Sequence, residues 1–170
     1  MATGAIGEGR DAIQDLRSQP AVHSDLAQLL TATGQELARA PDVEGNAANG
    51  NDANGNPVIF RVAVEGERQA LDPIIQDEAY RIARELLRNA FRHAQAGQIE
   101  AEIRYEDRLF RVRIRDDGKG IEPEIVKAGG RGGHWGLLGM RERAQRLGGE
   151  LHLASQPGSG TEVEVEVPLP

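Results

Sequence analysis

The segment QIEAEIRYEDRLFRVRIRDDGKG, residues 98–120, contains two stretches of alternating apolar and charged residues joined by a polar turn. Alternation with a period of two is typical of half-buried strands, so the segment predicts a β-hairpin with strands at 98–105 and 108–116. Glu106-Asp107 is not a favoured two-residue turn, so a longer loop stays open. With that two-residue loop, apolar pairs share one face and opposite charges the other: Ile103 with Phe110, Ala101 with Val112, Ile99 with Ile114, Glu102 with Arg111 and Glu100 with Arg113.

Two adjacent aspartates end this hairpin. Alternation along residues 108–117 places Asp116 on the inward, apolar face and Asp117 on the solvent side. A buried carboxylate needs a hydrogen-bond donor, and the glycines at 118 and 120 leave room for a flat ligand. We therefore predict that Asp116 accepts a hydrogen bond from an exocyclic amine such as that of adenine, while Asp117 braces the turn. A plain polar turn remains the alternative for this segment alone.

Elements on both sides of the hairpin define the fold class. A Gly-, Asn- and Ala-rich stretch at 44–57 predicts a flexible loop, and Pro20 predicts a break between two N-terminal helices. The predicted helices and strands, in chain order, are a helix ending near 18, a helix at 24–40, a strand at 58–64, a helix at 72–96, the hairpin, a helix at 138–147, and strands at 150–155 and 161–167. They predict a two-layer α/β (α+β) sandwich, whose mixed, mostly antiparallel sheet carries its helices on one face.

The helix at 72–96 carries three polar residues at the edge of its apolar face. Glu85, Asn89 and His93 follow one another at intervals of four, so they stack on successive turns. A carboxylate and an amide placed in this way could position a water and complete the oxygen shell of Mg²⁺. In the alternative interpretation Glu85 pairs with Arg81 or Arg88, and Asn89 only lies at a crowded edge.

Two further glycine-rich segments are candidates for ligand contact. GGRGGHWGLLG, residues 129–139, leads into a predicted helix, and the exposed amides of a helix N-terminus suit phosphate oxygens. GSGT, residues 158–161, could lie by the same site. Each segment alone is equally consistent with a plain turn. The sequence has no P-loop, no calcium-loop spacing and no arrangement typical of a hydrolytic triad.

Composition excludes several other classes. The net charge of −7 argues against a general nucleic-acid binder. The absence of cysteine excludes disulfides and Cys-based zinc sites. No apolar run approaches the ~18 residues of a membrane span, and no signal peptide is visible. We expect a cytoplasmic domain without membrane contact of its own, in a parent protein that could be anchored in the inner membrane.

Taken in order, the motifs resemble the Bergerat-fold ATP-binding domain of the GHKL superfamily. ELLRNAFRHA at 85–94 resembles its N box, DDGKG at 116–120 its first glycine box, GHWGLLGM at 133–140 the second and GSGT at 158–161 the third. The resemblance covers about 58–168. It is strongest to sensor histidine kinases of the nitrate-sensor and desaturase-sensor type, whose lid-to-C-terminus segment is similar to residues 134–168.

The resemblance implies ATP and Mg²⁺ as cofactors and a role for each motif residue. Asn89 would bind Mg²⁺, Glu85 would be the catalytic acid/base or water-positioning residue, and Asp116 would bind the adenine amine. Gly133, Gly136 and Gly139 would belong to a mobile lid and its hinge. The nucleotide-contacting residues that it implies are Asn89, His93, Asp116, Gly118, Gly120, Gly133, His134, Gly136, Leu137, Gly139, Gly160 and Thr161.

The phosphoacceptor box of these kinases is missing, since His23 in QPAVHSDLAQ does not match it. The chain therefore looks like a truncated catalytic half: a remnant of the dimerisation region and a lead-in helix at 1–40, a flexible loop at 41–57 and an ATP-binding domain at 58–170. It would transfer the γ-phosphoryl group to a histidine on a separate phosphoacceptor domain, upstream of a response regulator, without autophosphorylation of this chain. The alternatives are an anti-sigma-factor serine kinase of the same fold and a non-catalytic interaction module.

Overall fold

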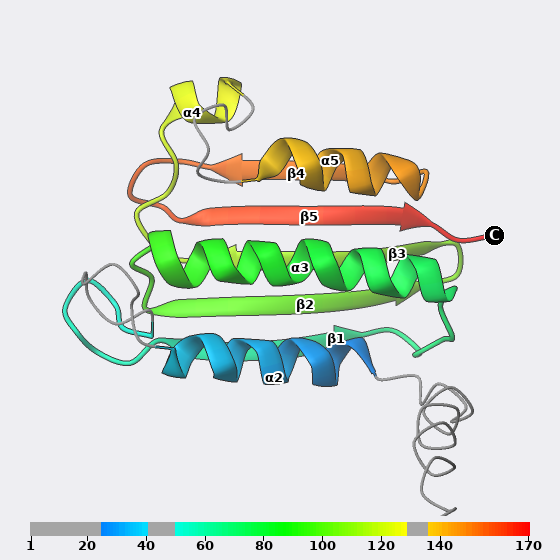
Figure 1. Cartoon of the computed structure of the whole chain (residues 1–170), viewed down its shortest axis with the longest axis horizontal. Helices are drawn as coiled ribbons and strands as arrows, with labels where there is room; N and C mark the ends of the chain where they lie inside the picture. The colour runs from blue at the N-terminus through cyan, green and yellow to red at the C-terminus, as the bar shows by residue number, and fades with distance from the viewer. Residues whose placement is uncertain (1–24, 41–49, 129–135) are drawn as a thin grey trace, which may run out of the picture.

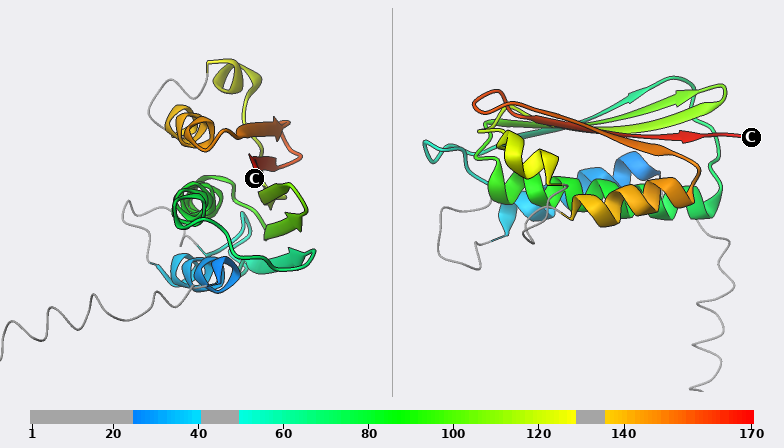
Figure 2. Two further views of the ribbon diagram at one scale, coloured as in Figure 1. Left: turned by 90° about the vertical axis from the view of Figure 1, so that its right-hand side faces the viewer. Right: turned by 90° about the horizontal axis from the view of Figure 1, so that it is seen from above.

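The computed structural model describes residues 25–40, 50–128 and 136–170. A five-stranded sheet in the order β1-β2-β3-β5-β4 carries helices on one face, as Figures 1 and 2 show. Only the β1–β2 pair is parallel, which confirms the predicted mixed two-layer sandwich. The strands are β1 Ile59–Glu65, β2 Gln98–Glu106, β3 Leu109–Asp116, β4 Glu150–Ser155 and β5 Thr161–Pro168, and the helices are α2 Leu26–Arg39, α3 Pro73–His93, α4 Pro123–Lys127 and α5 Leu137–Arg146.

The central helix α3 covers the middle of the sheet. It begins where the Asp72 side chain accepts a hydrogen bond from the amide of Ile74 at 2.8 Å. It ends three residues before the predicted 96, because Gln95 adopts a left-handed conformation and the carbonyl of Ala94 accepts the amide of Lys119 at 2.8 Å. Its apolar face, with Ile82, Ala83, Leu86, Leu87, Ala90 and Phe91, is buried against the sheet.

Helix α2 packs on the edge strand through a glycine. The buried Gly34 faces the ring of Phe60, and a Cβ added at Gly34 would lie 2.0 Å from the Phe60 Cε1 atom. Phe60 in turn contacts Phe91 of α3, with ring centroids 5.8 Å apart. The absence of a side chain at Gly34 therefore lets α2 join the same apolar layer as α3.

The hairpin has the predicted faces in a different register. Glu106 joins β2 and pairs with Leu109, so the two-residue loop is Asp107-Arg108 and every pair shifts by two residues. Ile103 lies opposite Val112 rather than Phe110. A shift of two preserves the inward and outward faces, because side chains alternate with a period of two.

Two short segments differ from the expected elements. Residues 50–57, predicted as loop, form a turn in which Asp52 Oδ1 accepts the amides of Asn54 and Asn56, both at 2.8 Å. The short helix α4 was not predicted. The first N-terminal helix and the loop at 41–49 lie outside the described residues. Among the helices of the described ranges, none is long and apolar enough to cross a bilayer.

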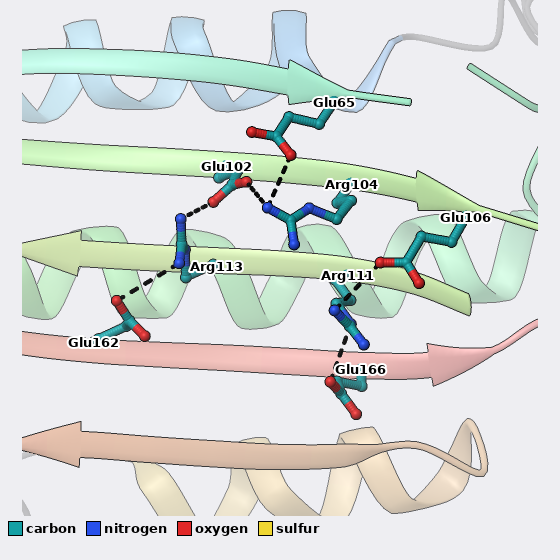
Figure 3. Close-up of polar contacts among 8 residues, drawn as sticks. All are labelled: Glu65, Glu102, Arg104, Glu106, Arg111, Arg113, Glu162 and Glu166. Atoms are coloured by element: carbon teal, nitrogen blue, oxygen red, sulfur yellow. Dashed lines mark hydrogen bonds and ion pairs between the residues drawn. The ribbon is translucent and has the colours of Figure 1, made fainter. Parts of the chain in front are cut away.

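The outward face of the sheet carries a network of arginines and glutamates (Figure 3). Glu102, only 5% exposed, forms ion pairs with Arg113 and, at 2.7 Å, with Arg104. Arg104 also contacts Glu65 at 2.8 Å, and hydrogen bonding to Glu102 raises the pKa of the Arg104 guanidinium. Arg113 lies 3.8 Å from Glu162 at the rim of the network. Each arginine of the network therefore lies between two carboxylates, one of which, that of Glu102, is shielded from water.

We expect Gly34→Ala to destabilise the fold by about 1–2 kcal/mol, because overpacking against Phe60 outweighs the better helix propensity of alanine. The free energy of unfolding is measured by urea denaturation. The matched control is Gly139→Ala in α5, where no atom lies within 4 Å of the added Cβ. The free energy of unfolding of this control should rise by up to about 1 kcal/mol. A higher free energy of unfolding in Gly34→Ala than in the wild type would contradict the packing described for α2.

We expect Glu102→Gln to lower the free energy of unfolding by about 1–3 kcal/mol, because two guanidinium groups lose their shared charged partner. Glu162→Gln is the matched control, since the Glu162 side chain is 39% exposed and such pairs contribute about 0–1 kcal/mol. Urea is the denaturant because guanidinium salts would screen the network. Equal losses in the two variants would show that burial of Glu102 has no special effect.

Candidate functional site

Three adjacent strands place polar side chains in one row at the end of the sheet where β3 stops, on the left in Figure 1. Asp116 on β3 lies opposite Thr161 on β5, which lies opposite Ser155 on β4. Asp116 and Thr161 line a cavity between the sheet, α3 and the first residue of α5. The remaining lining residues are Leu86, Asn89, Ala90, Ile114, Ile121, Leu137, Leu153 and Val163. The site is thus an apolar cavity with a polar end.

The two aspartates have the unequal positions that alternation predicted, Asp116 buried and Asp117 exposed. Asp116 is 7% exposed, and its Oδ1 accepts the amide of Gly118 at 2.9 Å. Burial raises the pKa of Asp116, and hydrogen bonds from the amides of Gly118 and Thr161 oppose this shift. Asp117 is exposed, and its Oδ1 accepts the amides of Gly97 and Gln98, both at 2.8 Å. Asp117 therefore braces the loop between α3 and β2.

The glycines beside Asp116 are required by contacts between main chains. A Cβ at Gly118 would lie 2.1 Å from the carbonyl oxygen of Ala94, and one at Gly120 would lie 2.1 Å from that of Gln156. A Cβ at Gly160 would lie 2.0 Å from the carbonyl oxygen of Asp116. The third glycine segment thus lies against the first, as expected. Close packing of the backbone explains these glycines without a ligand.

The polar edge of α3 reaches the same end of the cavity. Asn89, 6% exposed, lines the cavity. Glu85, one turn earlier, forms an ion pair with Arg88 at 2.7 Å, as one of the alternatives predicted. The Cβ position at Gly136 lies 3.6 Å from Oε1 of Glu85, so the start of α5 borders this carboxylate. His93 is partly buried one turn after Asn89 and is not among the lining residues.

The second glycine segment is described only in part. Leu137 is buried in the cavity wall, directly after Gly136 with its positive φ of 56°. Gly139 lies in α5, with open space around its Cβ position. The predicted contacts at Gly133 and His134 lie outside the described residues.

Of the apolar lining residues, sequence reasoning named only Leu137 as a site residue, and three omissions at this site are informative. Ile121 and Leu153 line the cavity, and Ser155 ends the row beside Thr161. Ser155 had a usable signal, because it closes a predicted strand whose pairing with the strand at 161–167 would have placed it beside Thr161. Ile121 follows a glycine turn and has no periodic context from which its position could be predicted.

The comparison with protein families identifies this domain. Residues 74–170 match the family described as histidine kinase-, DNA gyrase B- and HSP90-like ATPases, and the match covers more than half of the chain. The chain belongs to this ATPase family. All the described residues that line the cavity lie within the matched range. The expected GHKL-type ATP-binding domain is therefore confirmed.

Curated relatives of this ATPase domain are sensor proteins. The sensor histidine kinase LiaS of Bacillus subtilis is 35% identical over 100 residues, which are 59% of this chain and 27% of LiaS. The sensor protein VraS of Staphylococcus aureus is 35% identical over 97 residues, or 56% of this chain and 26% of VraS. The histidine-protein kinase/phosphatase DegS of Brevibacillus brevis is 29% identical over 171 residues, or 96% of this chain and 42% of DegS. The chain thus spans less than half the length of these relatives.

The raised pKa of Asp116 predicts how stability depends on pH. As the pH falls from 7 through this raised pKa, the folded state takes up a proton before the unfolded state does, so the penalty of the buried charge is relieved. The wild type should therefore gain stability relative to Asp116→Asn between pH 7 and about pH 4. Urea unfolding of both proteins across this range measures the difference. A constant difference, or one that moves against the wild type on acidification, would contradict the direction of the shift.

Proposed function

We propose that this chain is the ATP·Mg²⁺-binding catalytic domain of a two-component sensor histidine kinase. It transfers the γ-phosphoryl group of ATP to a histidine on a separate phosphoacceptor domain, and a response regulator acts downstream. The observation that carries the proposal is the buried carboxylate of Asp116 at the polar end of an apolar cavity in a domain of the ATPase family. An adenine ring would fill the apolar space, and its exocyclic amine would donate to the carboxylate.

Adenine entry requires the cavity to widen. Its volume is about 20 Å³, which is enough for roughly one water molecule. The wall at Leu137 is flanked by Gly136 and Gly139, which supports a hinge at the start of α5. Opening and closing of such a wall would admit the nucleotide and then exclude water from its phosphates. Gly133 and His134 belong to the same proposed segment.

Asn89 fits a Mg²⁺ ligand because its amide supplies a neutral oxygen at the cavity wall, and Mg²⁺ prefers oxygen ligands completed by phosphates and water. When bound, Mg²⁺ neutralises phosphate charge. Glu85, beside Gly136 and Asn89, would act on the incoming imidazole or a water as acid/base or positioning group. This role requires the Glu85 carboxylate to leave its ion pair with Arg88, which lies 2.7 Å away. Catalysis would then consist mainly of positioning and charge stabilisation.

Histidine is favoured over serine as the phosphoryl acceptor by the relatives. LiaS and DegS are named histidine kinases, and the DegS match extends over 96% of this chain. A serine kinase of the same fold remains the second candidate. The two candidates are distinguished by whether a histidine or a serine becomes phosphorylated.

Calorimetric titration with ATP, with and without Mg²⁺, tests the nucleotide and metal sites. We expect the wild type to bind ATP more tightly with Mg²⁺. Asn89→Ala should lose most of this Mg²⁺ enhancement while its Mg²⁺-free affinity changes about threefold or less. Asp116→Asn should weaken ATP binding about 10- to 100-fold under both conditions, because a charge-assisted hydrogen bond contributes about 1.5–3 kcal/mol.

Phosphoryl transfer is then measured by adding the purified phosphoacceptor domain of DegS and radiolabelled ATP. Acid-labile label on that domain supports a histidine kinase, and acid-stable label on a serine would support the second candidate. Absence of ATP binding in the wild type, or full retention of the Mg²⁺ effect in Asn89→Ala, would refute the corresponding assignment. Thermal unfolding of each variant controls for loss of the fold.

A further inference from the structure

Ser155 is the third residue of the polar row, behind the cavity wall. Its hydroxyl makes three contacts: the amide of Ile121 donates to Oγ at 2.8 Å, the carbonyl oxygen of Gly160 lies at 2.9 Å, and Oγ1 of Thr161 lies at 2.9 Å. The three partners come from the loop after β3, the turn before β5 and the first residue of β5. One hydroxyl therefore connects the segments that surround Asp116.

The directions of these hydrogen bonds follow from the number of protons. A serine hydroxyl has one proton and two lone pairs. The amide of Ile121 can only donate and the carbonyl of Gly160 can only accept, so the Ser155 proton points to Gly160. Thr161 must then donate its own proton to Ser155 Oγ, because any other arrangement leaves lone pairs facing each other at 2.9 Å. Thr161 lines the cavity, so a ligand there would meet its Oγ1 only as an acceptor.

The polar end of the cavity thus presents acceptors. Asp116, directly opposite Thr161 in the sheet, is an acceptor-only carboxylate when ionised. Its Oδ1 already accepts the amide of Gly118 at 2.9 Å. Two neighbouring acceptors match an amino group, which has two N–H donors, and oppose an oxo group, which would place another lone pair against them.

We propose that Ser155 is a positioning residue that directs the Thr161 proton away from the cavity and thereby makes the site select a 6-aminopurine over a 6-oxopurine. This inference rests on the proposed binding of ATP. Ser155 does not line the apolar cavity, although it lines an adjoining open hollow with Asp116 and Thr161. Its effect on the cavity passes through Thr161. Its hydrogen bond from Ile121 also joins two loops, so its loss could change the affinity for every nucleotide. Base selectivity separates the two effects.

The test compares the dissociation constants of ATP and inosine triphosphate for the whole chain. The latter differs from ATP in its 6-oxo group and protonated N1. In Ser155→Ala the Thr161 proton is free to turn into the cavity and donate to the oxo group. We expect the preference for ATP to fall about three- to tenfold, as for one neutral hydrogen bond. Ser155→Thr, which keeps the hydroxyl, should keep the wild-type preference. Melting temperatures control for folding.

Thr161→Val provides a second variant, because it removes the hydroxyl on which Ser155 acts. This variant should also lose preference for ATP, and adding Ser155→Ala to it should change the ratio of the two constants less than twofold. An unchanged ratio in Ser155→Ala, even with both affinities reduced, would overturn the inference. The inference would also be overturned if Ser155→Ala changed the ratio of the two dissociation constants equally in the wild type and in Thr161→Val. If the wild type binds neither nucleotide, the proposed function itself fails, whereas wild-type ATP binding with unaltered selectivity refutes only the role of Ser155.

Discussion

The antiparallel pairing of β3 with β5 is the constraint on which the rest of the molecule depends. On the inward face it pairs Ile114 with Val163 in the core. On the outward face it places Arg111 opposite Glu166 in the ion network. At the end of the strands the same ladder brings Asp116 opposite Thr161. A slip of one residue would exchange the two faces and remove the core, the network and the site together.

Periodicity along single strands predicted the faces and therefore the fold. It could not predict the hairpin register, because a shift of two residues keeps every side chain on its face and the turn residues Glu106, Asp107 and Arg108 offer no decisive signal. The sequence pattern also placed the end of α3 at 96 instead of His93, because it lacked information on long-range contacts. The helix end is determined by a contact between Ala94 and Lys119, which are distant in the sequence. Helix α4 has five residues, too few for a helical period to appear.

Within the site, the burial of Asp116 was predictable because it ends the inward-facing pattern of its strand. Asn89 was a candidate because it lies at the edge of the apolar face of α3. The position of Ser155 beside Thr161 could also have been inferred from strand pairing. Its hydrogen bonds could not, since they come from three segments that meet at one hydroxyl. The reason for the glycines could not be predicted from the sequence. Sequence indicates that a side chain is absent at Gly120 and Gly160, but only the packing shows that a neighbouring main chain occupies the space. Motif glycines near a ligand site can thus be structural in origin.

The close approach of main chains at Gly120 and Gly160 makes the Asp116 side of the cavity mechanically different from the Leu137 side. Around Asp116 the loops are joined to one another, for example by the amide of Gly158 and the carbonyl of Lys119 at 2.7 Å. Around Leu137 the wall depends on one short helix that follows a left-handed glycine. Substitutions at the start of α5 can therefore change the Leu137 side of the cavity without a clash between main chains. On the Asp116 side, where an added Cβ would collide with backbone, chemical preference can change only through replacement of polar side chains.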